Sequence, residues 1–200
     1  MSENRKTTKT RFSMVKKRHA GTLQKAKEEG KIDKEMIGLC DYISSRKNFF
    51  TSSGCSGRIL LLGLLDKSKK NSYFHRKWHE KVQPLEVIKA LKEPTKGEIW
   101  LKMEPFIIHI GTNSLENAKK ILSLKDKSGI KRGGIITAKP GKFIVELIGT
   151  EELAVLVKRG NKILAPEEFI KETVLEADKK IGFNYARVKE FEKIVRKELL

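Results

Sequence analysis

Apolar residues recur along this chain with the helical spacing of three or four in some segments and run together in others. Good helix formers fill the segment from Arg11 to Glu29, and Gly30 follows it as a C-terminal cap does. Further helices are expected to begin near Asp33, Pro84, Asn113 (with Glu116 as a capping box) and Pro166. The last of these has one apolar stripe, which predicts an amphipathic helix.

Strands are expected where bulky apolar residues run between small or polar turns. The run from Ile59 to Leu65 suits a strand buried on both faces. Further strands are expected over residues 73–79, 98–110, 130–138, 143–148, 153–157 and 163–164. Tight turns join the strands after residue 130, so these strands are antiparallel. The pattern predicts an α+β fold: a single compact domain over residues 11–200, a mainly antiparallel sheet with helices at the N-terminus, middle and C-terminus, and a basic, frayed tail over residues 1–10.

The charge of the chain points to an anionic partner. Its 200 residues include 43 Lys and Arg against 25 Asp and Glu, a formal net charge of +18. The excess is spread over the first 165 residues, whereas residues 166–200 are neutral, so it belongs to a basic face on a folded body rather than to a tail. Nucleic acid is the first candidate partner and an anionic membrane surface the second. The alternative is a highly charged surface of the thermophilic type, but Lys and Glu enrichment alone leaves the net charge small.

Several classes of protein are excluded. The apolar run from Ile59 to Leu65 is too short to cross a bilayer, and no secretory signal is expected behind the charged N-terminus. Cys40 and Cys55 cannot build a disulfide framework or a four-ligand zinc site. We therefore expect a cytoplasmic protein with no bound metal.

Two clusters could carry chemistry. In the turn from Ser52 to Arg58, small residues let the backbone approach a ligand, and hydroxyls, N–H groups and Arg58 can hold an anion. Its Gly-x-x-Gly spacing matches neither the phosphate-binding loop nor the dinucleotide fingerprint, so a tight turn before a buried strand is the alternative. In the cluster from His75 to His79, Trp78 beside cations can stack on a base. The alternatives are a metal site completed by Cys55, core packing of Trp78 and a half-buried His79.

Two further clusters are weaker. Glu104 and His109 lie in an apolar strand, where a lone His is more often structural than catalytic. Lys131 and Arg132 lie on a flexible turn that suits phosphate contact, although a solvated charge run is the better interpretation of that cluster alone. The sequence shows no convincing Ser-His-Asp arrangement and no paired acidic residues in a polar context.

Five segments occur in an order and at distances that are typical of one family. They are 49–59, 77–79, 104–110, 128–135 and 166–169. On these segments the chain, from about residue 11 to its end, resembles the tRNA wybutosine-synthesising protein 3 family, most of all its shorter archaeal members. Gly54 and Gly133 stand where the family has Ser, so neither hydroxyl is expected to be essential. Asn113 stands where eukaryotic relatives have Arg, which removes one cation from the expected site.

The resemblance implies an S-adenosylmethionine-dependent methyltransferase that acts on a ring nitrogen of the tricyclic wyosine-type base at position 37 of phenylalanine tRNA. The cofactor is then S-adenosyl-L-methionine and the partner is tRNA. The catalytic residues expected on this hypothesis are His79, His109, Ser53 and Cys55. The residues expected to bind the cofactor are Ser52, Ser56, Gly57 and Glu104. The residues expected to contact RNA are Arg58, Arg76, Lys77, Trp78, Lys131 and Arg132.

Methyl transfer to nitrogen benefits from a base that removes the N–H proton. His79 is the first candidate for this base and His109 the second, while alignment of donor and acceptor is the alternative contribution. The cations at 58, 76, 77, 131 and 132 are expected to gather on one face, around one pocket.

Two other functions stay open. A non-catalytic RNA-binding module would use the Ser/Gly turn to hold phosphate, and stabilisation by S-adenosylmethionine alone would distinguish the enzyme from it. A peripheral membrane protein is disfavoured, because no helix combines a strong apolar face with a basic one and the last helix is neutral.

Overall fold

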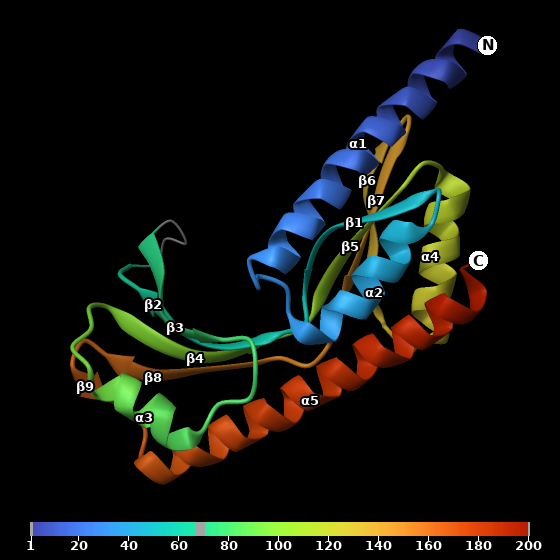
Figure 1. The fold of residues 1–200 in the computed structure, drawn as a ribbon. Helices are drawn as coiled ribbons and strands as arrows, with labels where there is room; N and C mark the ends of the chain where they lie inside the picture. The colour runs from blue at the N-terminus through green and yellow to red at the C-terminus, as the bar shows by residue number, and fades with distance from the viewer. Residues whose placement is uncertain (1, 67–70, 200) are drawn as a thin grey trace. The chain divides into compact units, whose positions relative to one another are not determined.

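The computed structural model describes residues 2–66 and 71–199 (Figure 1). The helices are α1 (Ser2–Glu28), α2 (Lys34–Ser45), α3 (Pro84–Lys92), α4 (Leu115–Lys127) and α5 (Glu167–Glu198). The strands are β1 (Phe49–Cys55), β2 (Arg58–Leu64), β3 (Ser72–Trp78), β4 (Glu98–Glu104), β5 (Ile107–Thr112), β6 (Arg132–Lys139), β7 (Lys142–Ile148), β8 (Leu153–Arg159) and β9 (Lys162–Ile163). All strand pairs are antiparallel, which confirms the predicted α+β class.

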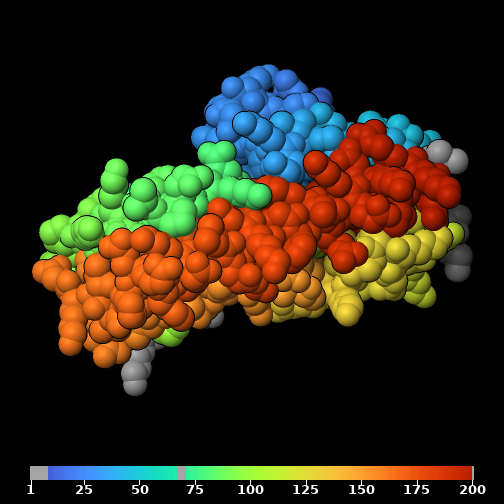
Figure 2. Space-filling view, turned by 90° about the horizontal axis from the view of Figure 1, so that it is seen from below, coloured from blue at the N-terminus to red at the C-terminus, as the bar shows by residue number. Residues whose placement is uncertain are grey.

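The chain divides into two compact units, each with its own sheet. The first unit holds residues up to Ser56, Phe106–Thr150 and the chain from Tyr185 onward, and the second holds Gly57–Pro105 and Glu151–Asn184. Helix α5 contributes residues to both units, and Figure 2 shows that one side of it is exposed along its length. None of the helices in the described ranges has both the length and the apolar composition of a membrane span.

Helix α1 begins earlier than the sequence pattern predicts. Residues 2–10 were expected as a frayed tail, and the structure places them in the first turns of α1. No Gly or Pro interrupts the chain before Gly21, so nothing in the backbone stops the helix from extending toward the N-terminus.

The first unit is built on the sheet β1-β5-β7-β6, which has an apolar cluster on each face. Phe49, Ile110 and Val145 point to one face and pack with α2, α4 and the C-terminal part of α5. Phe50 and Ile144 point to the other face and pack with Phe12 of α1. The polar row described below lies on this second face, because its members alternate with the residues of the first face.

The second unit is built on the sheet β3-β2-β4-β8-β9. Residues of one face are fully buried, among them Ile59, Leu61 and Leu101, and Figure 1 shows α3 and the first part of α5 on the same side of this sheet. The opposite face carries Leu62 together with its cross-strand partners Phe74 and Trp100. Within the described part of this unit, no helix lies on that face.

Two predicted features differ from the structure. The single strand expected over residues 98–110 is two strands in different sheets, because Pro105 lacks the N–H group needed to continue a ladder. Helix α4 is capped by Ser114, whose side chain accepts a hydrogen bond from the Asn117 backbone N–H, rather than by Asn113.

Candidate active site

Three polar side chains form a row on the face of the first unit's sheet that also carries Phe50 and Ile144. Ser53 of β1 pairs with His109 of β5, and His109 pairs with Glu146 of β7. Directly paired residues of antiparallel strands point to the same face. Ser53 Oγ lies 2.8 Å from His109 Nδ1, and His109 Nε2 lies 2.7 Å from a carboxylate oxygen of Glu146.

One arrangement of protons satisfies both hydrogen bonds of this row. An ionised carboxylate only accepts hydrogen bonds, so His109 Nε2 donates to Glu146. In a neutral imidazole Nδ1 is then an acceptor, and the Ser53 hydroxyl donates to it. The His109 and Glu146 side chains are each 24% exposed, and Ser53 is more exposed still. This hydrogen-bonded row of serine, histidine and carboxylate, called the relay below, is therefore partly exposed.

The sequence shows no convincing Ser-His-Asp arrangement, and the structure forms a related row with Glu146 in place of Asp. Ser53 and His109 are 56 positions apart, and His109 and Glu146 are 37 apart. Only the strand order β1-β5-β7 brings them together. Glu146 was missed for the same reason, since nothing in its local sequence distinguishes it from the other acidic residues.

A pocket of about 200 Å³ opens beside Ser53, within the first unit. It is lined by β1 (Ser52 and Ser53), by α1 (His19 and Thr22) and by α2 (Met36 and Cys40). The β1 register shifts between Thr51 and Ser53, so Ser52 is an extra residue in the strand. Two of the predicted site residues, Ser52 and Ser53, thus line one pocket, and Ser53 also belongs to the relay.

His19 is a pocket residue that the sequence did not single out. Its ring stacks on Phe50 with the centroids 4.8 Å apart and 8° between the planes. Burial, followed by the charges of Arg18 and Lys142, lowers the pKa of His19, so the imidazole is neutral at pH 7. The pocket wall therefore offers a flat, uncharged ring.

The end of the predicted Ser/Gly turn has a structural role in this fold. Ser56 is buried, and its backbone N–H and hydroxyl donate to the same Asp33 carboxylate oxygen at 2.7 and 3.0 Å. Gly57 adopts a φ of 107°, which favours glycine. These contacts tie the turn to the start of α2, so Ser56 and Gly57 hold the backbone rather than face the pocket.

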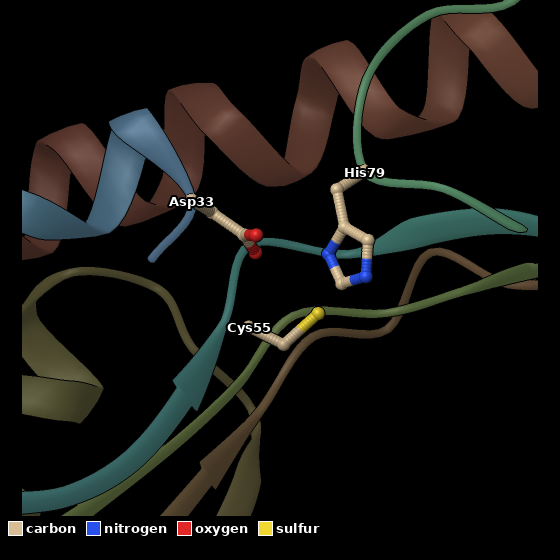
Figure 3. Close-up of side chains that lie close together, drawn as sticks. All are labelled: Asp33, Cys55 and His79. Atoms are coloured by element: carbon tan, nitrogen blue, oxygen red, sulfur yellow. The ribbon is translucent and has the colours of Figure 1, made fainter. Parts of the chain in front are cut away.

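Cys55 ends β1 near the same carboxylate. Figure 3 shows Asp33 and Cys55, and an oxygen of Asp33 lies within 4.8 Å of Cys55 Sγ. Cys55 lies two residues beyond Ser53, opposite Ile107. His79, also labelled in Figure 3, follows β3 in the second unit and is half-buried there. Of the four expected catalytic residues, Ser53 and His109 are joined by a hydrogen bond.

Glu104 belongs to a charge cluster on the second unit's sheet. It accepts hydrogen bonds from Arg58 at 2.7 Å and from Lys102 at 3.2 Å. Burial acts to raise the pKa of the Glu104 carboxyl, but Arg58 and Lys102 outweigh burial and leave this pKa below its usual value. Glu104, which was expected to bind the cofactor, is thus the ion-pair partner of Arg58, which was expected to contact RNA.

The expected RNA-binding residues of the second unit do not share one face. Arg76 forms an ion pair with Glu93 at 2.6 Å, and Trp78 Nε1 donates to Glu86 at 2.7 Å, so both lie on the side of α3. Arg58 and Lys77 lie on the other side, beside Phe74. The expectation that these cations gather on one face is therefore wrong within this unit.

Lys131 and Arg132 belong to the first unit, where both are exposed at the start of β6. The following Gly133 has a φ of 136°, and a Cβ there would lie 2.2 Å from the Glu146 carbonyl oxygen. Glycine is therefore required at 133 by the close approach of β7, and a serine side chain has no room in this backbone.

Comparisons with known proteins identify the family to which this fold belongs. The family model described as "Methyltransferase TYW3" matches residues 9–197. A protein of Pyrococcus abyssi named "tRNA(Phe) 7-((3-amino-3-carboxypropyl)-4-demethylwyosine(37)-N(4))-methyltransferase 1" is 32% identical over 182 residues, which are 90% of this chain and 94% of that protein. The human "tRNA wybutosine-synthesizing protein 3 homolog" is 32% identical and covers 90% of this chain, which spans 72% of it.

A solved structure supports the same assignment. The PH1069 protein from Pyrococcus horikoshii superposes with a TM-score of 0.87 and 32% identity, covering 93% of this chain and 97% of its own. A protein from Aeropyrum pernix with 19% identity and a TM-score of 0.71 shares the fold. The resemblance found from the sequence is confirmed, and this chain belongs to the TYW3 methyltransferase family.

Proposed function

We propose that this protein transfers a methyl group from S-adenosylmethionine to a ring nitrogen of the wyosine-type base at position 37 of phenylalanine tRNA, a step of wybutosine biosynthesis. The relatives that carry this activity in their names match this chain over most of their length. The relay of Ser53, His109 and Glu146 beside a pocket is the observation that carries the proposal.

The pocket has the mixed chemistry that a methyl donor of this kind requires. Thr22 and Ser52 supply hydroxyl groups, and Met36 supplies an apolar wall. S-adenosylmethionine, when bound, supplies a methyl group on a positively charged sulfur. We assign Thr22 and Ser52 to holding the cofactor, and His19 offers its ring for stacking.

The relay supplies a route for the proton that the reacting nitrogen loses. The acceptor nitrogen would use its lone pair for the new bond to the methyl group, the electron pair of the broken bond would remain with the cofactor, and the N–H proton must leave. The N–H proton passes to Ser53 Oγ as the hydroxyl proton moves to His109 Nδ1. His109 then carries a positive charge, and the Glu146 carboxylate at 2.7 Å stabilises it.

Single-turnover methylation of saturating tRNA tests this assignment. We expect His109→Ala to lower the rate by about 100-fold or more, and Glu146→Gln by about 10-fold or more, because each removes a step of the proton route. Glu116→Gln, an exposed residue of α4, is the matched control and should retain the wild-type rate. A larger loss for His79→Ala than for His109→Ala would move the base to His79. Failure of the wild-type protein to methylate this tRNA would overturn the proposed function.

A further inference from the structure

Phe74 is an exposed aromatic side chain on the sheet of the second unit. It lies on the edge strand β3 and keeps 53% of its surface exposed. Large apolar side chains on sheets normally face the core. Here the core lies on the opposite face of the sheet, around Ile59 and Leu61. Phe74 therefore lies on the face of this sheet that carries no helix in the described part of the unit, called the open face below, and its ring is exposed there.

Two cations flank the Phe74 ring. The guanidinium carbon of Arg58 lies 5.2 Å from the ring centroid, and Nζ of Lys77 lies 5.6 Å from it. Arg58 is held in position because Glu104 accepts a hydrogen bond from its Nε and forms an ion pair with its Nη2. Lys77 contacts no carboxylate among the described residues. One cation is thus fixed beside the ring, and the other is available to an anion.

The open face continues past Phe74 with residues of similar chemistry. Leu62 of β2 pairs with Phe74 on one side and with Trp100 of β4 on the other. Phe74 and Trp100 therefore lie two strands apart on one face, and their backbones are separated by about twice the strand spacing of ~4.8 Å. Lys102 lies on the same face, opposite the fully buried Leu60, so the exposed part of this face is the part around Phe74. Aromatic rings and cations on an open sheet face are what unpaired bases and their phosphates require for binding.

We propose that the open face of strands β3, β2 and β4, centred on Phe74, binds single-stranded RNA. An unpaired base stacks on the Phe74 ring, and Lys77 and Arg58 attract the neighbouring phosphates. The inference rests on the proposed function, because the anticodon loop of the substrate tRNA supplies the unpaired bases. It also moves the stacking role from Trp78, whose Nε1–H is bonded to Glu86, to Phe74.

Binding of a labelled anticodon stem-loop of phenylalanine tRNA tests this proposal. We expect Phe74→Ala to raise the Kd by about 10-fold, because removing a stacking ring weakens binding by this order, and Phe74→Trp to keep the Kd within about 3-fold. Phe183→Ala on α5 is the matched control, since Phe183 is 52% exposed, and its Kd should equal that of the wild type. Far-UV circular dichroism and the melting temperature should show that each variant is folded.

The salt dependence separates stacking from charge. Phe74→Ala should leave the slope of log K against log salt unchanged, whereas Lys77→Gln should reduce it by about one. An unchanged Kd for Phe74→Ala would overturn the proposal, as would a change in oligomeric state without a change in RNA affinity. Should the wild type bind the stem-loop through Phe74 but fail to methylate tRNA, the proposed function would fall and the RNA platform would stand.

Discussion

In the second unit, three side chains expected to bind RNA or a base are held in place by carboxylates. Glu93 binds Arg76, Glu86 binds Trp78, and Glu104 binds Arg58. The first two pairs join β3 to α3, so they contribute to the fold of this unit. The third pair lies on the open face, where it orients a cation beside Phe74.

The pair of Arg58 and Glu104 predicts a dependence of stability on pH. The folded-state pKa of Glu104 is depressed, so the folded protein binds this proton less tightly than the unfolded chain does. The stabilisation is therefore present above the unfolded pKa of about 4.5 and is lost as the pH falls through the lower folded pKa. Glu104→Gln should reduce the free energy of unfolding by about 1 kcal/mol at neutral pH, as expected for a half-buried ion pair.

Urea unfolding of Glu104→Gln at neutral pH and at about pH 3 checks this sign. The difference from the wild type should shrink at the acidic pH, where the native carboxyl is increasingly protonated. Glu116→Gln serves as the control, because Glu116 is exposed and forms no ion pair with the described residues. A difference of the same size at both pH values would contradict the assignment.

At the scale of elements, the sequence pattern predicts structure correctly where it depends on local periodicity, as in helices. It does not predict the register in which two strands pair. The apolar stripe predicted for the last helix is buried at Ile170, Val174, Ala177, Ile181, Val188 and Val195. In β3, however, the register shift opposite Leu61 and Leu62 makes His75 an extra residue. Strict alternation would place Phe74 on the same face of the strand as Trp78, whereas the bulge places it on the same face as Lys77. No local signal marks such a bulge, so the sequence favoured Trp78 as the stacking residue.

Packing of α1 on the first sheet depends on a glycine in β5. A Cβ built on Gly111 would lie 2.0 Å from the Phe50 ring, and Phe50 is only 1% exposed. Gly111→Ala should therefore force the ring to shift and cost about 1–3 kcal/mol of stability. Gly134→Ala in β6 of the same sheet is the control, since nothing lies within 4 Å of its added Cβ. Chemical denaturation of both variants checks the prediction, and equal stabilities would contradict it.

At the scale of the whole molecule, the net charge of +18 is carried by cations that differ in their partners. Between Glu3 and Glu28 the sequence has nine basic residues and no acidic one. In the described part of α1, Arg11, Lys17 and Arg18 are exposed and contact no carboxylate. Cations without internal partners release the most counterions when they meet phosphates. This helix is therefore the segment whose charge should most affect affinity for a polyanion.

The salt dependence of tRNA binding measures how many of these cations meet phosphate. Four or more phosphate contacts predict that wild-type affinity falls by about 100-fold between 50 and 200 mM salt. Replacing Arg11, Lys17 and Arg18 by Gln should reduce the slope of log K against log salt by about two to three. Replacing Lys119, Lys120 and Lys189 by Gln removes the same charge from α4 and α5, which pack on the other face of the first sheet. Equal slopes for the two triple variants would show that net charge alone, and not the face carrying α1, governs binding.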